Sequence, residues 1–264
     1  MPVPSLGRDA SDGAVPPDLA ASDRGASDTG ASGPGASDRV SSDRRGPPHL
    51  GPGRADELQA LAEPMRVYLD AANAARERGL AACRRTIRAC GSAIRCVHRL
   101  QPDRSATFVA EAGTALAEAQ AALAPHPSLA HAGFLHDAEK EYAEAMLTIA
   151  LVDGGPLPTV EVVGVGVPAW LNGLAEAASE LRRHLLDRLR DGQLERAESL
   201  LTAMEDVYDL LVTIDYPDAM TGGLRRTTDA LRAVLERSRS DLTTTLLQAR
   251  LQAAIERRGR SGLD

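Results

Sequence analysis

The sequence predicts an all-α fold, on the basis of its composition and its hydrophobic periodicity. Ala, Leu and Arg dominate the 264 residues, whereas aromatic residues make up only 3%, and this composition favours helices over sheets. From Ala55 onward, apolar residues recur at intervals of three and four, which is the spacing of one helix face. About 210 residues show this pattern, enough for a single helical bundle of about six or seven helices.

The first part of the chain has a different composition. Residues 1–53 consist largely of Ala, Ser, Asp, Gly and Pro with a loosely repeated Ala-Ser-Asp unit, and such a segment buries too little apolar surface to offset its ordering entropy. It is predicted to be a disordered tail, either a regulatory arm or the result of a start site assigned too far upstream. The helical domain is expected to span 54–258, with a flexible C-terminus at 259–264.

Helix signals divide the domain into segments. The first long helix is expected to follow a break before Pro64, because proline removes a helical hydrogen bond. Predicted helices cover about 65–99, 105–123, 128–152, a segment from Pro168 to the Asp191-Gly192 turn, a segment that ends near Ile214, and 224–257. The β-branched run 160–167 resembles a strand but has no partner strand, so a short helix and loop are expected.

Charge and cysteine content exclude several classes of protein. The net charge of −7 argues against a protein that coats nucleic acid indiscriminately. Cys83, Cys90 and Cys96 are an odd number without Cys-x-x-Cys spacing, and they are predicted to be buried small hydrophobic residues in a reducing compartment rather than zinc ligands. No apolar run approaches the length of a membrane span and no signal peptide is visible, so a cytoplasmic protein is expected.

Acidic residues gather on one face of the predicted helix 128–152. At about 100° per residue, Asp137, Glu141, Glu144 and Thr148 fall within one narrow arc beside an apolar stripe. Like charges at these spacings repel, so they need a compensating cation, which can be a metal ion, a basic partner or simply hydration. A solvated helix face is the alternative interpretation.

The first long helix has a basic face. Four arginines, which we name the arginine stripe, share one side of it with His98, opposite a side that carries Ile87: Arg84, Arg88, Arg95 and Arg99. Between Arg76 and Arg99 the only acid is Glu77, so the usual neutralising neighbours are missing. The stripe is predicted either to contact phosphates or to be solvated or paired with acids of another helix.

The helix that begins at Pro168 carries polar residues opposite its leucines. They are Glu176, Glu180, Arg183, His184 and Asp187, and they either serve a site or pair with one another. His98 and His184 are candidates for proton transfer, although a histidine on a polar face is more often solvated.

The order of these features resembles the translin family, which includes translin and Trax, over roughly residues 60–252. The matching segments are His131-Ala132-Gly133-Phe134, Glu141-Tyr142-Ala143-Glu144-Ala145, Leu171-Asn172-Gly173-Leu174, Ser179-Glu180-Leu181-Arg182-Arg183, Asp215-Tyr216-Pro217-Asp218-Ala219 and Gly223-Leu224-Arg225-Arg226. The resemblance implies an all-helical homo-oligomer, often an octamer, around a cavity that holds single-stranded RNA or DNA.

The resemblance also implies a choice between two activities, because Trax holds Mg²⁺ on a carboxylate cluster and cuts RNA whereas translin chiefly binds nucleic acid. Glu141 and Glu144 match the Trax glutamates, and Glu176 stands where Trax has an aspartate. Glu180 matches a glutamate of both branches, and Lys140, the only lysine of the chain, replaces a glutamine.

These matches lead to one main hypothesis and two alternatives. The main hypothesis is an endoribonuclease in which Glu141, Glu144 and Glu176 are catalytic and bind Mg²⁺ or Mn²⁺, with Glu180 as a fourth candidate ligand, since hard oxygen donors suit these ions. The arginine stripe would then hold the nucleic-acid backbone. The alternatives are a binding oligomer without catalysis and a purely structural helical scaffold.

Overall fold

The computed structural model describes residues 53–261, and in this part of the chain it contains nine helices and no strand. Six helices are long: α1 (Gly53–His98), α2 (Pro102–Leu123), α4 (Phe134–Asp153), α6 (Val167–Arg190), α7 (Leu194–Val212) and α9 (Leu224–Ser261). Three have about one turn: α3 (Pro127–Ala130), α5 (Val160–Val163) and α8 (Asp218–Thr221). The all-α prediction is confirmed. The low-complexity tail lies outside the described residues except for Gly53.

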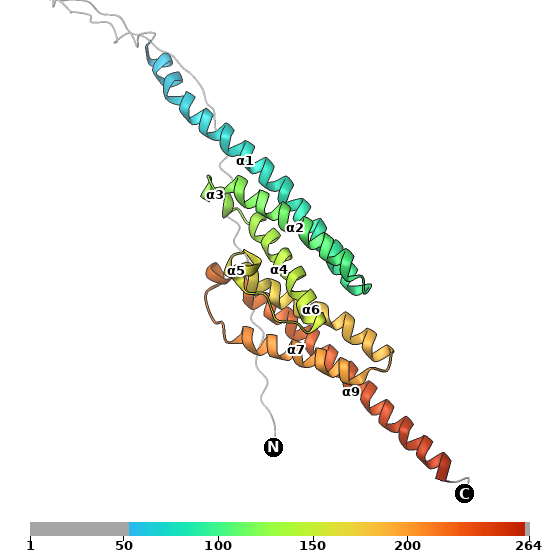
Figure 1. The fold of residues 1–264 in the computed structure, drawn as a ribbon. Helices are drawn as coiled ribbons and strands as arrows, with labels where there is room; N and C mark the ends of the chain where they lie inside the picture. Colours follow the sequence, from blue (N-terminus) through green and yellow to red (C-terminus); the bar gives the residue numbers. More distant parts are fainter. Residues whose placement is uncertain (1–52, 262–264) are drawn as a thin grey trace, which may run out of the picture. The chain divides into compact units, whose positions relative to one another are not determined.

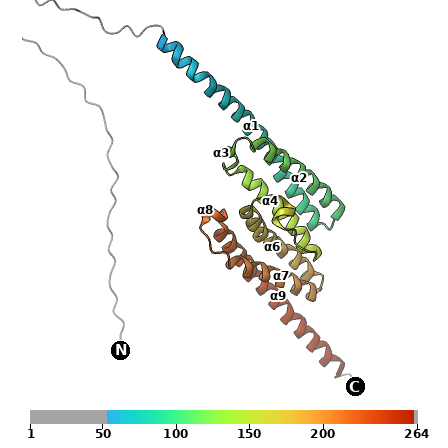
Figure 2. The same ribbon diagram turned by 60° about the vertical axis from the view of Figure 1, so that its left-hand side comes forward.

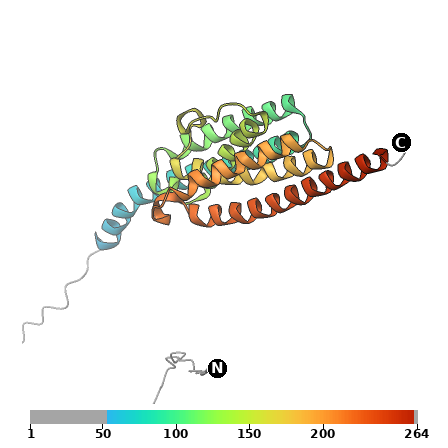
Figure 3. The ribbon, with the colours of Figure 1, turned by 90° about the horizontal axis from the view of Figure 1, so that it is seen from below.

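The long helices pack in a regular succession (Figure 1). The α2 helix turns back along α1, and α4 packs against both of them. On its other side α4 packs against α6, which in turn contacts α7 and α9. Figures 2 and 3 show the same succession from two further directions. The α4–α6 pair therefore lies in the middle of the bundle.

Two helix boundaries differ from the prediction. The expected break before Pro64 is wrong, because α1 runs through this residue from Gly53; the surrounding Ala, Leu and Glu residues favour the helix, and proline removes only its own donor. The expected helix 128–152 is divided, since Gly133 has φ +92°, a conformation that glycine adopts readily. As a result the acidic segment begins a new helix at Phe134.

The valine-rich segment forms a short helix and loop, as predicted. The Thr159 hydroxyl accepts a hydrogen bond from the Val162 amide at 3.4 Å, which caps α5 at its start. Gly164 ends the helix with φ +73°. Val163 is buried against the α4–α6 core, so the run gains its burial without a partner strand.

Small residues allow α4 and α6 to approach closely. A Cβ atom at Gly173 would lie 2.7 Å from the Ala143 Cβ and 2.9 Å from both the Glu144 amide nitrogen and the Lys140 carbonyl oxygen. These are distances at which only a glycine fits. Ala143, Leu147, Leu174 and Ala177 are fully buried around this crossing, and it fixes how the polar residues of the two helices face each other.

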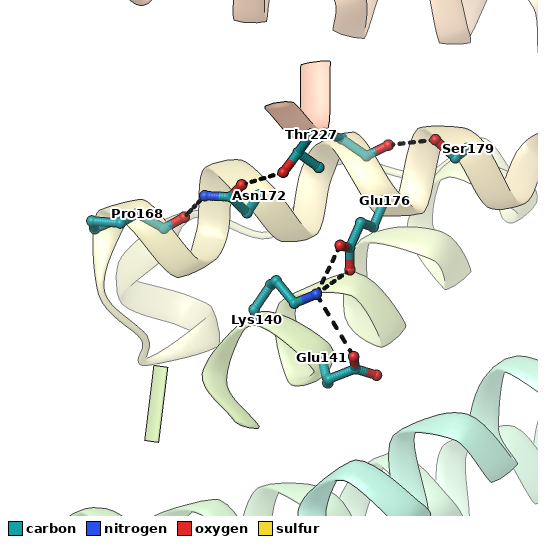
Figure 4. A network of polar contacts seen from close by, with 8 residues as sticks. Lys140, Glu141, Pro168, Asn172, Glu176, Ser179 and Thr227 are labelled. Carbon is teal, nitrogen blue, oxygen red and sulfur yellow. Dashed lines mark hydrogen bonds and ion pairs between the residues drawn. The ribbon is translucent and has the colours of Figure 1, made fainter. Parts of the chain in front are cut away.

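The start of α6 is attached to α8 and α9 through Asn172, which is only 2% exposed. Its amide nitrogen donates to the Pro168 and Thr221 carbonyl oxygens, both at 2.8 Å. Its side-chain oxygen accepts from the Thr227 hydroxyl at 2.6 Å, and Figure 4 shows this contact. The asparagine thus satisfies all of its hydrogen-bonding groups that face the interior.

No helix of the described part is long and apolar enough to cross a membrane.

We expect a Gly173→Ala substitution to destabilise the protein by about 1 to 3 kcal/mol, the usual cost of overpacking a core. The new methyl group meets the Ala143 side chain and two backbone atoms of α4, and backbone moves less readily than a flexible side chain. Urea denaturation of both proteins measures the difference in free energy of unfolding.

The matched control is Gly91→Ala, also inside a helix. A Cβ atom there would meet only the tip of Arg95, at 3.4 Å, so the change should stabilise the protein by about 0.5 to 1 kcal/mol through the helix preference of alanine. Equal stability of the Gly173→Ala and unsubstituted proteins would show that the crossing is not tight.

Candidate functional site

Three glutamates from the two central helices converge. Glu141 and Glu144 of α4 and Glu176 of α6 each offer a carboxylate oxygen, and these atoms all lie within 4.8 Å of one another. We call these three residues the carboxylate cluster. Glu176 lies one turn after Gly173 on α6, so the close helix crossing directs it toward α4. Glu144 is 9% exposed, while the side chains of Glu141 and Glu176 are about one-third exposed, at 30% and 32%.

Lys140 supplies a positive charge to this cluster. Its Nζ donates to both carboxylate oxygens of Glu176 at 2.7 Å and lies 3.8 Å from Glu141 Oε1, as Figure 4 shows. Burial lowers the pKa of this ammonium, whereas the hydrogen bond to Glu176 and the charges of all three glutamates raise it. The net shift of the pKa is upward. Lys140 therefore stays charged at neutral pH.

Even with this ammonium, the cluster carries more negative charge than it can easily hold. Burial, with the charges of Glu141, Glu176 and Glu180, raises the pKa of Glu144 to about 9. Burial also raises the pKa of Glu141, against the opposing effect of Lys140. Glu144 therefore holds a proton at neutral pH unless a further cation replaces it.

Glu180 lies apart from the three converging oxygens. Its Oε2 is 2.7 Å from His98 Nε2, and because a carboxylate only accepts hydrogen bonds, His98 donates here. This hydrogen bond lowers the pKa of Glu180 more than burial raises it. The structure thus pairs the fourth predicted ligand with a histidine of α1, and its assignment to the metal stays a prediction.

His98 and His184 are not solvated, contrary to the simpler interpretation of their helix faces. The His98 side chain is only 7% exposed, and its Nδ1 lies 3.1 Å from His184 Nε2. Burial and the neighbouring His98 lower the pKa of His184 to about 4, so it is neutral at physiological pH. The alternative in which Arg183 pairs with Glu180 or Asp187 does not hold among residues 53–258, because Glu180 bonds to His98 and Asp187 pairs with Arg190.

The first helix forms the third wall of the site. Cys90 is fully buried, and burial with the charges of Glu141 and Glu144 raises its pKa to about 12, so this side of α1 faces the acids. The three cysteines are free and buried, as predicted. Ile87, on the side of α1 opposite the arginine stripe, is 36% exposed, because it lies at the border where α1 turns from the acids toward solvent.

The arginine stripe borders this wall. At about 100° per residue, Arg84 and Arg95 lie within roughly 60° of His98 around the helix axis. All four arginines are exposed, and none of them forms an ion pair with a carboxylate of residues 53–258. Arg99 follows the last residue of α1. Charged groups that are exposed and not neutralised are suited to bind a polyanion.

Arg85 of α1 lies outside the arginine stripe. It forms an ion pair with Glu118 of α2, across an open groove of about 880 Å³ that Arg88 also lines. The interpretation of basic residues paired with another helix therefore holds for Arg85 and not for the stripe. The helical spacing alone indicates this pairing weakly, because it places Arg85 toward the face of α1 that packs on α2.

We expect the stability of the folded protein to decrease as pH rises from about 7 to about 8, with Glu144 as the cause. The folded-state pKa of about 9 lies above the unfolded value of about 4.3. Stability from the bound proton is therefore complete below the lower value and is lost as pH rises through the higher one. Between the two, the free energy of unfolding should fall by about 1.4 kcal/mol per pH unit.

Urea denaturation of Glu144→Gln at the same pH values provides the control, because the amide does not titrate and the slope should disappear. His184, with its pKa lowered to about 4, contributes a slope of the opposite sign only below about pH 6.5. An equal slope in the two proteins would contradict this description of Glu144.

Solved structures of similar proteins support the fold. AfC3PO from Archaeoglobus is 30% identical, with 72% of this chain and 97% of that chain aligned and a TM-score of 0.65, in a structure with duplex RNA. A second crystal structure of AfC3PO gives the same identity and TM-score, over 98% of its length. Apo-NeC3PO from Nematostella is 19% identical, over 71% and 96% of the two chains with a TM-score of 0.60, and shows the fold alone.

One curated relative also aligns with the chain. The uncharacterized protein MJ0175 of Methanocaldococcus jannaschii is 28% identical over 126 residues, which are 47% of this chain and 56% of that protein. No family model matches the chain. AfC3PO, by contrast, is matched over nearly its whole length at 30% identity, and with the translin-like order of motifs and the same helical fold this shows that the chain belongs to the translin family.

Proposed function

We propose that this protein binds RNA along α1 and cuts it with a divalent metal ion held by the carboxylate cluster. The observation that supports the cutting activity most strongly is the convergence of three carboxylate oxygens within 4.8 Å, since Mg²⁺ and Mn²⁺ prefer oxygen ligands and keep several of their waters. The raised pKa of Glu144 is the second support. A carboxylate that keeps a proton at neutral pH has too little positive charge near it, and a divalent cation would supply that charge.

The choice of RNA rests on two observations. AfC3PO, which is 30% identical, has been solved with duplex RNA, and the arginine stripe offers exposed guanidinium groups on α1, the helix whose Cys90 side faces the cluster. Such groups bind phosphates without reading the bases, and aromatic residues for base stacking are scarce at 3%. Single-stranded RNA or DNA remains the expected partner, and duplex RNA is the comparison that any assay needs.

Each residue has a defined part in the proposed reaction. Glu141, Glu144 and Glu176 would hold the ion, and Glu144 would lose its proton as the ion binds, because the two compete for the same charge. When bound, the ion activates a water molecule and stabilises the charge that develops on the phosphoryl oxygens. Arg84 and Arg95, nearest to His98 around α1, would hold the backbone in place.

A second function has one specific observation in its favour. Lys140 already neutralises Glu176 through two hydrogen bonds of 2.7 Å, and a cluster with an internal cation needs no metal ion for its stability. In that case the protein would bind nucleic acid without cutting it. The two functions share the arginine stripe and differ only in what occupies the cluster.

We expect purified protein to cleave a labelled single-stranded RNA with Mg²⁺ or Mn²⁺ and not with EDTA. A Glu141→Gln/Glu144→Gln variant should lose at least about a hundredfold in rate, the scale expected when metal-assisted stabilisation is removed. A gel assay over time measures the rates, with duplex RNA of the same sequence alongside. Cleavage at the same rate in all samples would point to a contaminating nuclease and remove the case for this site.

Binding separates catalysis from recognition in the same experiment. The double glutamine variant should keep its RNA affinity, whereas Arg84→Gln/Arg95→Gln should bind more weakly, with a salt dependence reduced by about two units of slope. Binding that does not change with salt in any of these proteins would favour a structural scaffold.

We further propose that copies of this chain assemble, because two helix ends expose apolar stripes. On α1 the stripe precedes the first buried residue, Ala75, and it consists of Leu58, Leu61, Met65, Tyr68 and Leu69. On α9 it consists of Leu247, Leu251 and Ile255, all more than half exposed. Patches of this kind mark contact surfaces.

The charges of the two ends suit contact between copies. Residues 53–72 carry four acids and two arginines, whereas residues 244–258 carry three arginines and one glutamate. One end is therefore acidic and the other basic, which favours a contact between α1 of one copy and α9 of the next. The family resemblance suggests an octamer.

Light scattering should give a particle mass that is a multiple of 27.9 kDa. The Leu251→Glu/Ile255→Glu variant should give a smaller particle, because charges do not pack into an apolar contact. Leu210→Glu is the control, since Leu210 is 49% exposed on α7, away from both stripes. A monomer mass for the unsubstituted chain at every concentration would exclude the assembly.

A further inference from the structure

The only lysine of the protein lies in the carboxylate cluster. The other 29 of the 30 Lys and Arg residues are arginines. Arginines also form the ion pairs with Glu118, Glu205 and Asp241. A lysine differs from an arginine in a way that matters here. Its ammonium is a compact, strongly hydrated point charge on a flexible stem, whereas the guanidinium is a planar fork that holds a carboxylate with two parallel bonds.

The ammonium occupies the side of the cluster that a metal ion would need. Its Nζ is 2.7 Å from both oxygens of Glu176 and 3.8 Å from an oxygen of Glu141. Figure 4 shows it between these two side chains, which come from different helices. It therefore bridges α6 and α4 in the manner of a bound cation.

A divalent ion and this ammonium cannot use Glu176 together. Metal to oxygen distances are about 2.0 to 2.1 Å for Mg²⁺, so an ion on Glu176 would lie within a few ångströms of Nζ. Two positive charges at such a separation repel strongly in a partly buried site. Each cation therefore weakens the binding of the other at Glu176.

The lysine is able to leave. Its side chain is 22% exposed, and four rotatable bonds allow the ammonium to reach solvent while the stem stays in place. The aliphatic stem belongs to α4, next to the tight crossing at Gly173, so the departure requires no movement of either helix.

We propose that Lys140 is the resident cation of the carboxylate cluster and that a divalent ion binds at Glu176 only by displacing its ammonium. This inference rests on the proposed metal-dependent function and adds a control to it. The lysine keeps the cluster neutralised without metal, and it sets the metal concentration at which the site loads.

Calorimetric titration with Mn²⁺ tests the competition on the full-length chain. Lys140→Gln should bind Mn²⁺ at least about tenfold more tightly than the unsubstituted protein, because a unit charge close to the ion is removed. The control is Arg226→Gln, which removes the same charge from α9; the Arg226 side chain is exposed and makes no ion pair among residues 53–258. This control should bind Mn²⁺ with unchanged affinity.

The outcomes separate this inference from the proposed function. Equal Mn²⁺ affinity of the unsubstituted protein and Lys140→Gln overturns the competition and leaves the metal site intact. If the unsubstituted protein, Lys140→Gln and Glu144→Gln all fail to bind Mn²⁺, the metal-dependent function fails together with the competition.

A second measurement does not depend on the folding of a variant. Protein grown with ¹³C,¹⁵N-labelled lysine gives one set of side-chain NMR signals, because the chain has a single lysine. Saturation with Mg²⁺ should move the Cε and Nζ signals to the positions of a solvated lysine. Signals that stay unchanged at saturating Mg²⁺ would show that the ammonium remains on Glu176, and would overturn the proposal.

Discussion

The contact on which the site depends is the close crossing of α4 and α6 at Gly173. No side chain separates the helices at this point, since even a methyl group would lie 2.7 Å from the Ala143 Cβ. The polar residues that flank the crossing are then held at fixed positions on both helices: Lys140, Glu141 and Glu144 before and after Ala143, and Glu176 one turn beyond the glycine. The glutamates converge because the two backbones do, and the geometry of the cluster is therefore a property of the core and not of flexible surface side chains.

This placement destabilises the folded protein, because it brings buried carboxylates close together, and neighbouring groups must offset the cost. Burial of carboxylates in proximity disfavours their ionised forms, and the protein responds in three ways that differ from residue to residue. Glu144 binds a proton, since its pKa rises to about 9. Glu176 takes the ammonium of Lys140, and Glu180 takes a hydrogen bond from His98, which lowers its pKa. Natural proteins accept such local costs mainly where a site needs them.

Periodicity within one element predicted the helices and placed Glu141 and Glu144 on one helix face, whereas Glu176 of the second helix was predicted as their partner only through the resemblance to the translin family. It could not predict relations that depend on a second element. His98 shares a helix face with the arginines, yet it is buried, with its Nδ1 3.1 Å from His184 Nε2 of α6. Ile87 lies on the side of α1 opposite the arginines, yet it is 36% exposed because it is at the border of that side. The helix break at Pro64 was predicted from a local rule, and the helix forms regardless because the neighbouring residues favour it.

The difference between a nuclease and a binder of nucleic acid within this fold is a small one in physical terms. Both need the exposed arginines of α1, and both need a cation to hold the α4 and α6 carboxylates together. In this chain the cation that the structure shows is the ammonium of Lys140. The Glu144 carboxyl group is neutral because it carries a proton. If a metal ion binds as proposed, it would replace both the ammonium on Glu176 and the proton on Glu144, and its binding would release a proton and a side chain at once. The strength of metal binding would then depend on the competition between these occupants more than on the number of oxygen ligands.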